Sequence, residues 1–309
     1  MKFKEFHIYS FYRFFNHRQK RKSKKELDYF LSNKFVRGTI LLADEGINGT
    51  ISGSKKELDD VISFIRKILK IRKLNIKINK NNFLPFNRMR VRLKKEIVTL
   101  GKGDLNVTKK SVQLINPADW NNIITDKETT IIDVRNQFEV DIGKFKNALN
   151  PKTKSFRDFP RKLEHMGLRK DKKIAIYCTG GIRCEKAAIY MKMNGYKNIV
   201  QLRGGIINYL SYHNEKHSKN LWDGECFVFD ERVTINKELI KGKYLQCYGC
   251  RRPITKNDTL SVKYKKGVFC PYCFNERSEA QKQSSLSRQK QIDLANKKKQ
   301  PNKYRKTFA

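Results

Sequence analysis

The sequence predicts a multidomain protein with an α+β N-terminal part, a parallel α/β middle part and a small cysteine-rich C-terminal region. The first hundred residues show strand and helix patterns in the order β-α-β-β-α-β, and residues 115–218 alternate apolar runs with helical segments. Two Cys-x-x-Cys pairs follow within residues 247–273. These three patterns indicate separate layers and cores, and 309 residues are enough for two or three domains.

The first domain is predicted over residues 1–100 as a ferredoxin-like sandwich. Ser54 caps its second helix, and Glu57 three residues later completes a capping-box pattern. A basic run at residues 17–25 is expected on the connection before the first helix. Strands are expected at 6–15, around 76 and at 88–97, and residues 38–53 are expected to form a hairpin that turns at 44–46. Helices are expected at 26–33 and after residue 54.

One strand of this domain has a strongly basic face. With a period of two residues, Arg88, Arg90, Arg92 and Lys94 point to one side, and Met89, Val91 and Leu93 point to the other. A row of cations on one sheet face suits a phosphate backbone. The alternative is an ordinary solvated strand face. Because stacked like charges destabilise a strand that no polyanion neutralises, we favour RNA contact at these four residues.

A linker is expected at residues 101–114, and a parallel α/β domain at 115–218. Its expected helices begin near 116, 161, 185 and 206, and its expected strands lie at 130–134, 174–177 and 199–202. Strands that alternate with helices predict a parallel sheet covered on both faces, with functional loops at the carboxyl ends of the strands.

The residues after the apolar run at 174–177 carry the most informative motif. Cys178 stands where this strand ends, and the loop Thr179, Gly180, Gly181, Ile182 leads through Arg183 into a helix. Adjacent glycines allow successive N–H groups to form an anion-binding nest, and the helix N-terminus and Arg183 add positive charge. Each feature favours the reactive thiolate of Cys178. The alternative, a buried structural cysteine, explains neither the glycines nor the arginine.

This loop resembles the active-site loop of the rhodanese family, and the flanking motifs 131–136 and 200–206 agree with it. The longer string 178–186, with the segments on either side, resembles the rhodanese-containing family of oxygen-dependent tRNA uridine hydroxylases. The resemblance implies an acylphosphatase-like N-terminal domain, and an enzyme that converts the wobble uridine of tRNA, position 34, to 5-hydroxyuridine with molecular oxygen as co-substrate.

The resemblance also implies that tRNA binds through its anticodon loop and that Cys178 and Arg183 are catalytic. Cys178 then either adds to carbon 6 of uracil or takes part in oxygen activation as a persulfide or an oxidised sulfur. Cys184 is either a resolving cysteine or a packing residue at the start of the helix. The alternative function is a rhodanese-type sulfurtransferase that carries a persulfide on Cys178. A third, an RNA-binding module without catalysis, would make Cys178 dispensable.

A cysteine-rich, zinc-ribbon-like region is predicted at residues 219–276. Cys247 and Cys250 are separated by nineteen residues from Cys270 and Cys273, a spacing typical of zinc sites. Four thiolates around one ion indicate structural zinc; two disulfides and an iron–sulfur cluster are the alternatives. Cys226 lies beside an apolar strand and is expected to be buried and inert.

The net charge of +38 suits a polyanionic partner, although a biased genome would give the same excess of lysine. A basic, flexible tail is expected at residues 277–309, where ten Lys or Arg stand against two acidic residues. No long apolar run or signal peptide is present, so we expect a cytoplasmic protein that binds no membrane. The sequence contains no pattern for haem, flavin or NAD and indicates no obligate protein partner.

Overall fold

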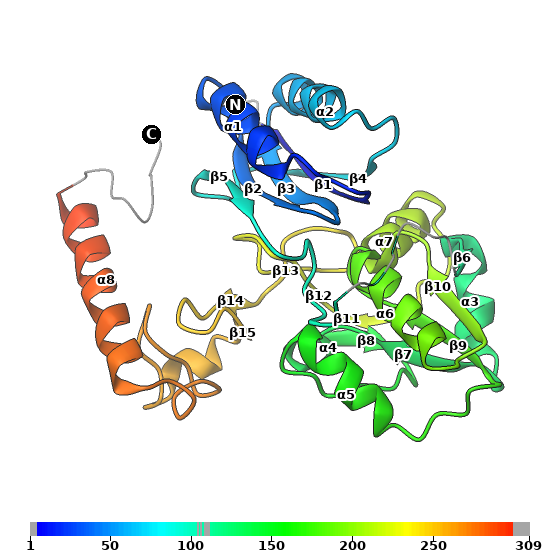
Figure 1. Cartoon of the computed structure of the whole chain (residues 1–309). Helices are drawn as coiled ribbons and strands as arrows, with labels where there is room; N and C mark the ends of the chain where they lie inside the picture. The colour runs from blue at the N-terminus through cyan, green and yellow to red at the C-terminus, as the bar shows by residue number, and fades with distance from the viewer. Residues whose placement is uncertain (1–4, 104, 106, 108–111, 299–309) are drawn as a thin grey trace.

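The computed structural model describes residues 5–103, 105, 107 and 112–298. It has an N-terminal sandwich, a central α/β unit and a set of cysteine-rich loops followed by a long helix (Figure 1). These parts agree with the predicted fold class. Within the described residues, no helix is both long enough and apolar enough to cross a membrane.

The N-terminal sandwich has two helices on one face of a five-stranded sheet. The sheet order β4-β1-β3-β2 is that of a ferredoxin-like fold, and β5 is added beside β2 as a parallel edge strand. The elements are β1 (Phe6–Phe14), α1 (Lys20–Ser32), β2 (Arg37–Ala43), β3 (Gly46–Gly53), α2 (Lys55–Leu69), β4 (Asn75–Asn81) and β5 (Met89–Leu93).

Two local expectations for this domain change. Helix α1 begins at Lys20, so most of the basic run predicted as a connection is helical, because lysine and arginine are good helix formers. At the start of α2, the Ser54 hydroxyl accepts from the Glu57 N–H at 3.3 Å as predicted. The Glu57 carboxylate, however, accepts from the Phe35 N–H at 2.7 Å, and this bond ties the helix start to the preceding segment.

The central unit is a parallel sheet in the order β6-β10-β9-β7, covered on both faces. Helices α3 and α7 contribute to the core on one face, and α5 and α6 to the core on the other. The elements are β6 (Gln113–Ile115), α3 (Pro117–Thr125), β7 (Thr130–Asp133), α4 (Gln137–Val140), β8 (Gly143–Phe145), α5 (Phe159–Glu164), β9 (Lys173–Tyr177), α6 (Ile182–Met193), β10 (Asn198–Leu202) and α7 (Gly205–Glu215).

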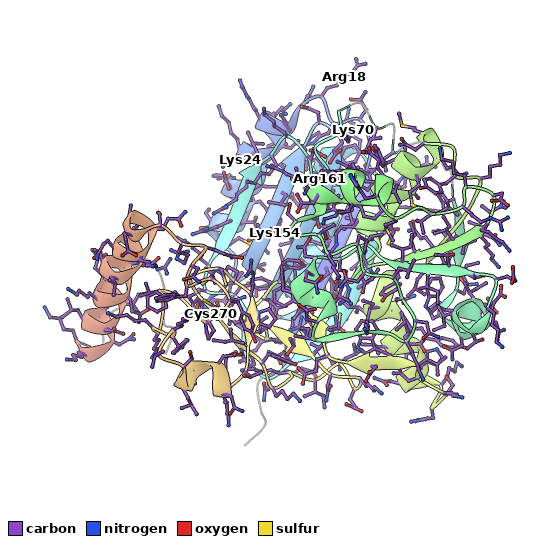
Figure 2. The ribbon with its side chains drawn as sticks, turned by 90° about the horizontal axis from the view of Figure 1, so that it is seen from below. Arg18, Lys24, Lys70, Lys154, Arg161 and Cys270 are labelled. Carbon is purple, nitrogen blue, oxygen red and sulfur yellow. The ribbon has the colours of Figure 1, made fainter. Side chains whose placement is uncertain are left out.

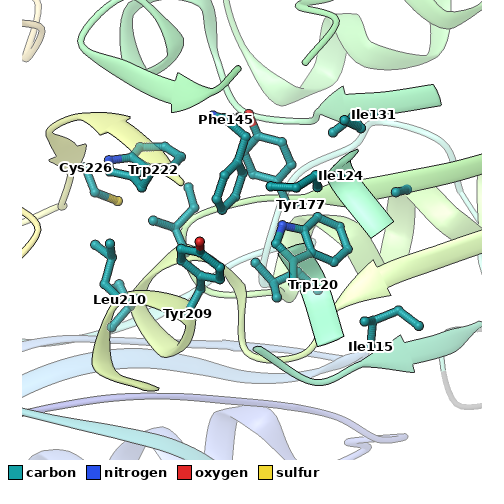
Figure 3. Close-up of a cluster of buried hydrophobic side chains, with 14 of the residues drawn as sticks. Ile115, Trp120, Ile124, Ile131, Phe145, Tyr177, Tyr209, Leu210, Trp222 and Cys226 are labelled. Atoms are coloured by element: carbon teal, nitrogen blue, oxygen red, sulfur yellow. Dashed lines mark hydrogen bonds between the residues drawn. The ribbon is translucent and has the colours of Figure 1, made fainter. Parts of the chain in front are cut away.

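An aromatic cluster fills one face of this sheet (Figure 3). The Phe145 ring meets Tyr177, Tyr209 and Trp222 edge to face, with centroid distances of 4.9 to 5.1 Å, an arrangement that adds to the stabilisation from burial. Trp222 belongs to β11 (Trp222–Gly224), which pairs with β8. The segment that follows α7 therefore completes the core of the central unit.

The C-terminal part contains short strand pairs, β12 (Cys226–Phe227) with β13 (Thr234–Ile235) and β14 (Leu245–Gln246) with β15 (Pro253–Ile254). Helix α8 (Glu279–Lys297) stands apart from the central unit (Figure 1). A reciprocal capping box between Ser278 and Gln281 starts this helix. Helix α8 lies within the expected tail, whose end, residues 299–309, is outside the described residues. Six of the fourteen residues of the expected linker, 104, 106 and 108–111, are also outside them. The flexibility of the tail stays a prediction.

Candidate active site and four-cysteine cluster

The predicted reactive loop joins β9 to α6 at the carboxyl edge of the parallel sheet. Gly181 adopts a φ of 99°, which glycine reaches without strain, and its N–H donates to the Cys178 sulfur at 3.1 Å. A Cβ on Gly205 would lie 2.3 Å from the Cys178 carbonyl oxygen. Glycines on both sides therefore allow the backbone to close around the cysteine.

Cys178 is fully buried, and its surroundings favour the thiolate. Burial by itself would raise the pKa of the Cys178 thiol. Hydrogen bonding from Cys184, the charge of Arg183 and the Gly181 N–H outweigh burial and hold the pKa of Cys178 well below its usual range. Burial and the neighbouring thiolate raise the pKa of Cys184 well above its usual range. Cys184 is therefore the proton donor of the pair.

Arg183 is held by a buried carboxylate that sequence reasoning did not assign. Its guanidinium donates to the two oxygens of Glu139 at 2.6 and 2.8 Å, and to the Thr179 hydroxyl at 3.2 Å. Glu139 is fully buried. Burial would raise the pKa of the Glu139 carboxyl, but the Arg183 charge and hydrogen bonds lower it. Arg183 is thus fixed in place beside the loop, and its charge acts on the sulfur.

A second buried ion pair joins Arg135 to Asp133 at the end of β7. Arg135 donates from Nε to Asp133 Oδ1 at 2.9 Å, from Nη2 to Oδ2 at 2.5 Å, and to the Gly143 carbonyl oxygen at 2.6 Å. The guanidinium also lies over the Trp222 ring, 5.0 Å from its centroid. These contacts tie β7 to β8 and to the aromatic core, so the pair acts in the structure as a connector.

The N-terminal domain covers the reactive loop. Lys77 on β4 donates from its ammonium group to the Gly180 carbonyl oxygen. Burial lowers the pKa of Lys77 to about 8, although the Cys178 charge acts in the opposite direction. Ile182 at the start of α6 packs against Tyr12, Phe14 and other apolar residues on the open face of the N-terminal sheet. The loop is therefore held between two domains.

Two side chains of α6 add polar contacts to this interface. The Tyr12 hydroxyl donates to Glu185 at 2.6 Å. Burial, together with the Cys178 charge, raises the pKa of the Glu185 carboxyl, so Glu185 is an acid or base candidate beside the sulfur. Lys186, 1% exposed, lies 2.7 Å from a Glu45 oxygen and 2.5 Å from a Glu96 oxygen. This ion triad fastens α6 to the N-terminal sandwich.

The predicted basic strand β5 has its cations on the face opposite the sandwich core, where Arg88, Arg92 and Lys94 are exposed and Arg90 is half-buried. Val91 packs in the core of the sandwich with Met89 and Leu93, so the alternation places the four cations on the opposite, open face of the sheet. Arg88 and Arg90 line a cavity of about 360 Å³, and Lys94 lines a separate cavity of about 1080 Å³ that reaches Lys186. The structure does not bring these cations into hydrogen-bonding contact with the Cys178 loop, and their RNA contact stays a prediction.

The four predicted metal ligands come together, and all their sulfur atoms lie within 4.8 Å of one another. The Sγ separations are 3.9 Å for Cys247–Cys273 and for Cys250–Cys270, and 3.8 Å for Cys270–Cys273. A tetrahedron with zinc–sulfur distances of about 2.3 Å has edges of about 3.8 Å. The separations exclude disulfides, whose sulfurs are about 2 Å apart, and leave space for one ion. Cys270 lies between α8 and the rest of the molecule (Figure 2).

Cys226 contrasts with Cys178. Both thiols are fully buried, but burial raises the pKa of Cys226 to about 12. Within the described residues its sulfur has only the Phe227 carbonyl oxygen, at 3.7 Å, as a hydrogen-bond partner, and burial outweighs the charges of Arg135 and Arg183. The surroundings are those expected of an inert structural cysteine.

Sequence reasoning missed Glu139, Lys77, Tyr12 and Glu185 as site residues. A signal existed for Glu139, since it forms a capping box with Asn136 directly after the Asp-Val-Arg motif. Glu185 follows the loop directly in the helix that it opens. No local signal marks Tyr12 or Lys77, because they lie more than 100 residues from the loop and reach it only through domain packing.

Comparison with known proteins agrees with this architecture. Residues 6–97 match the "UPF0176 acylphosphatase like domain", and residues 116–211 match the "Rhodanese-like domain". A rhodanese-related protein of Thermoplasma volcanium is 31% identical over 32% of this chain and 92% of its own, with a TM-score of 0.28. A rhodanese-like domain protein of Staphylococcus aureus is 26% identical over 32% of this chain and 91% of its own, also with a TM-score of 0.28.

A relative that spans nearly the whole chain is more informative. The protein named "tRNA uridine(34) hydroxylase" from Pelagibacter ubique (strain HTCC1062) is 44% identical over 293 residues, which cover 94% of this chain and 96% of the relative. The match extends through both matched domains and the cysteine-rich region, and it confirms the predicted resemblance. The chain therefore belongs to the tRNA uridine(34) hydroxylase family, with an acylphosphatase-like N-terminal domain and a rhodanese domain.

Proposed function

We propose that this protein hydroxylates uridine 34 of tRNA to 5-hydroxyuridine, with molecular oxygen as co-substrate. The observation that carries the proposal is the Cys178 sulfur, held as a thiolate inside a closed loop in a chain of this family. A thiolate with a lowered pKa is a nucleophile at neutral pH. This environment distinguishes Cys178 from the structural Cys226.

The residues around Cys178 support covalent activation of the base. Addition of the thiolate to carbon 6 of uracil moves an electron pair towards carbon 5, which bonds to one atom of oxygen, while the other atom leaves as water with two electrons from an external reductant. Loss of the carbon 5 proton then expels the thiolate and restores the double bond. Arg183 keeps the sulfur anionic before addition, and Glu139 holds the guanidinium in position. Glu185 has a raised carboxyl pKa and is suited to take up the proton that leaves carbon 5. Cys184 holds a proton beside the sulfur and serves as its hydrogen-bond donor.

The tRNA is expected to bind through its anticodon loop on the open face of the N-terminal sheet. Arg88, Arg90, Arg92 and Lys94 supply cations for phosphates along β5. The wobble base is unpaired in the loop, so it reaches a protein pocket without opening a duplex. Because the same domain contacts the reactive loop through Lys77 and Tyr12, RNA bound there lies near Cys178.

The four-cysteine cluster is proposed to hold a structural zinc ion. Cys247, Cys250, Cys270 and Cys273 would supply four thiolates, a complete ligand set with no open position for substrate. Zinc would fix the short strands β14 and β15 around one centre. The cluster residues are mostly buried, which also suits a structural ion rather than a catalytic one.

The experiment that tests the function is nucleoside mass spectrometry of tRNA from cells that lack 5-hydroxyuridine. The cells are complemented with the native protein, with Cys178→Ser, or with the matched control Cys226→Ala at a buried cysteine outside the loop. We expect 5-hydroxyuridine with the native protein and the control but not with Cys178→Ser. Formation with all three would remove Cys178 from the mechanism.

A different result would favour the sulfurtransferase. If no variant gives 5-hydroxyuridine, and thiosulfate or a persulfide donor labels the Cys178 sulfur of the native protein, sulfur transfer replaces hydroxylation as the function. The geometry of the loop suits either reaction, because a nest of N–H groups binds a persulfide as well as a thiolate. The nucleoside analysis therefore decides between them.

A further inference from the structure

A cavity of about 360 Å³ opens where the N-terminal domain, the rhodanese domain and the cysteine-rich region meet. We call it the junction cavity. Arg90 of β5 contributes from the first domain, Phe138 from α4 of the second, and Arg251, next to a metal-ligand cysteine, from the third. Its volume lies within the range of small-ligand sites, roughly 300–1,000 Å³. A site built from all three parts forms only in the fully folded chain.

Phe229 gives this cavity an aromatic surface. Its side chain is 65% exposed, which is unfavourable for so large an apolar ring. The buried Phe227 ring nevertheless meets it edge to face, with 5.1 Å between centroids, and the Arg183 guanidinium lies 5.9 Å from its centroid. The ring is therefore held in a defined position with much of its surface uncovered, as in aromatic platforms on which RNA bases stack.

The charges around the cavity suit a phosphate. Arg88, Arg90 and Arg251 supply three cations, and Asp230 and Glu231 are the acidic residues of the lining. Both acidic groups are engaged within the protein. The Asp230 carboxylate accepts from Arg232 at 2.6 and 2.9 Å.

Glu231 is satisfied in a different way. Its carboxylate accepts from the Tyr248 hydroxyl at 2.6 Å and from the Asn87 amide at 3.2 Å. With Asp230 paired with Arg232, three guanidinium groups of the lining stand against the single carboxylate of Glu231, so the lining has a net positive charge. An apolar ring beside several guanidinium groups matches the two parts of a nucleotide, its base and its phosphate.

We propose that the junction cavity binds an unpaired nucleotide of the substrate RNA, with the base stacked on Phe229 and the phosphate near Arg88 and Arg90. This proposal rests on the proposed function and names the place where the RNA strand is held. Arg183 contacts both the Phe229 ring and the loop residue Thr179. A base on Phe229 is therefore separated from the Cys178 loop by a single side chain.

The test measures binding of a fluorescently labelled anticodon stem–loop RNA with an unpaired uridine at position 34. Native protein is compared with Phe229→Ala, with Phe229→Trp, and with Tyr29→Ala as the control. Tyr29 is an aromatic residue on α1, 80% exposed and absent from the cavity lining. Loss of one stacked base weakens binding about 5- to 150-fold. We expect that loss for Phe229→Ala, recovery for Phe229→Trp, and unchanged binding for Tyr29→Ala.

Two further readouts separate stacking from indirect effects. The rate at which iodoacetamide alkylates Cys178 in each variant shows whether the loss of the Phe229 ring disturbs Arg183 and the thiolate; we expect less than a twofold change. A stem–loop carrying photoreactive 4-thiouridine should crosslink to a peptide that contains Phe229 in native protein.

The outcomes also separate this inference from the proposed function. If Phe229→Ala binds the stem–loop as tightly as native protein does, while native protein forms 5-hydroxyuridine, the stacking site is wrong and the hydroxylase stands. If native protein binds no stem–loop and forms no 5-hydroxyuridine, both the stacking site and the hydroxylase function are wrong. A crosslink that maps only to other aromatic residues would overturn the assignment to Phe229.

Discussion

The buried pair of Glu139 and Arg183 predicts that stability and cysteine reactivity respond differently to mutation. Glu139→Gln removes the charge that neutralises Arg183, while Arg183→Met removes the cation and leaves the carboxylate. Each change leaves one charge buried without its partner, because the two side chains are 0% and 7% exposed. Both single variants should therefore be less stable than native protein.

The magnitude follows from the burial and geometry of the pair. Two charge-assisted hydrogen bonds of 2.6 and 2.8 Å join the groups, and breaking a buried pair by removing one partner costs about 3–5 kcal/mol. Such a loss lowers the urea midpoint by on the order of 1–3 M for a small domain. The double variant Glu139→Gln/Arg183→Met buries no unpaired charge there, so it should recover much of the loss.

The reactivity of Cys178 should change in opposite directions. In Glu139→Gln the Arg183 charge acts on the sulfur without a neighbouring carboxylate, so the pKa of Cys178 falls further. In Arg183→Met that charge is absent, and the pKa of Cys178 rises. At a pH near 6 the thiolate fraction, and with it the rate of Cys178 alkylation, should be highest in Glu139→Gln and lowest in Arg183→Met.

Unfolding can be followed specifically in this domain. The protein has two tryptophans, and Trp120 and Trp222 both lie in the rhodanese core, so tryptophan fluorescence in urea reports on that unit. Alkylation of Cys178 is measured against pH by peptide mass spectrometry. A stability loss below about 1 kcal/mol for both single variants, as for an exposed pair, would refute the reasoning. So would a shift of the Cys178 pKa in the same direction in both.

Three further predictions concern the surroundings of Cys178 and the metal cluster. Lys77→Met should slow Cys178 alkylation at neutral pH because it removes a cation bound to the Gly180 carbonyl. The control Lys80→Met, at an exposed ion pair on the same strand, should leave the alkylation rate unchanged. Equal alkylation rates in Lys77→Met and native protein would exclude a role for Lys77. Cys184→Ala should raise the pKa of Cys178 towards about 8.5. In native protein the thiolate stabilises the fold at pH values above about 8.5, the pKa of a thiol in the unfolded chain, and this stabilisation is lost as the pH falls through the lowered pKa of folded Cys178. Cys184→Ala should therefore lose less free energy of unfolding over this pH range than native protein does, and identical profiles of stability against pH would contradict this. A zinc chelator should release one metal ion per chain and raise by four the number of thiols that react with a colorimetric reagent, counted above any reaction of Cys178, whereas Cys226 should stay protected; a number that the chelator does not change would argue against a bound ion.

The fold was predictable wherever local pattern and tertiary structure agree. The strand period around Val91 and the loop glycines are local signals, and the structure has a strand at Met89–Leu93 and a glycine-containing turn before α6 as they predicted. The paired Cys-x-x-Cys motifs likewise predicted a cluster that depends on only four side chains.

The contacts between domains could not be predicted from the sequence. Lys77 has the sequence environment of any strand lysine, and its contact with Gly180 depends on how two domains dock. The two cavities beside the β5 cations have the same origin, since alternation gives the face of a strand but not what lies opposite it. Residues 20–25 were misjudged for another reason, because charge density was taken as a sign of a connection although lysine and arginine favour helices.

The four-cysteine cluster is connected to the basic strand β5 through Glu231. The Glu231 N–H donates to the Pro85 carbonyl oxygen at 2.9 Å, and its carboxylate accepts from Asn87 and from Tyr248. Tyr248 directly follows the ligand Cys247, while Pro85 and Asn87 precede the basic strand. An ion that fixes Cys247 therefore also fixes the loop from which β5 begins. Since Cys178 is held by contacts that do not involve this cluster, removing the ion should weaken RNA binding while Cys178 alkylation continues at its native rate.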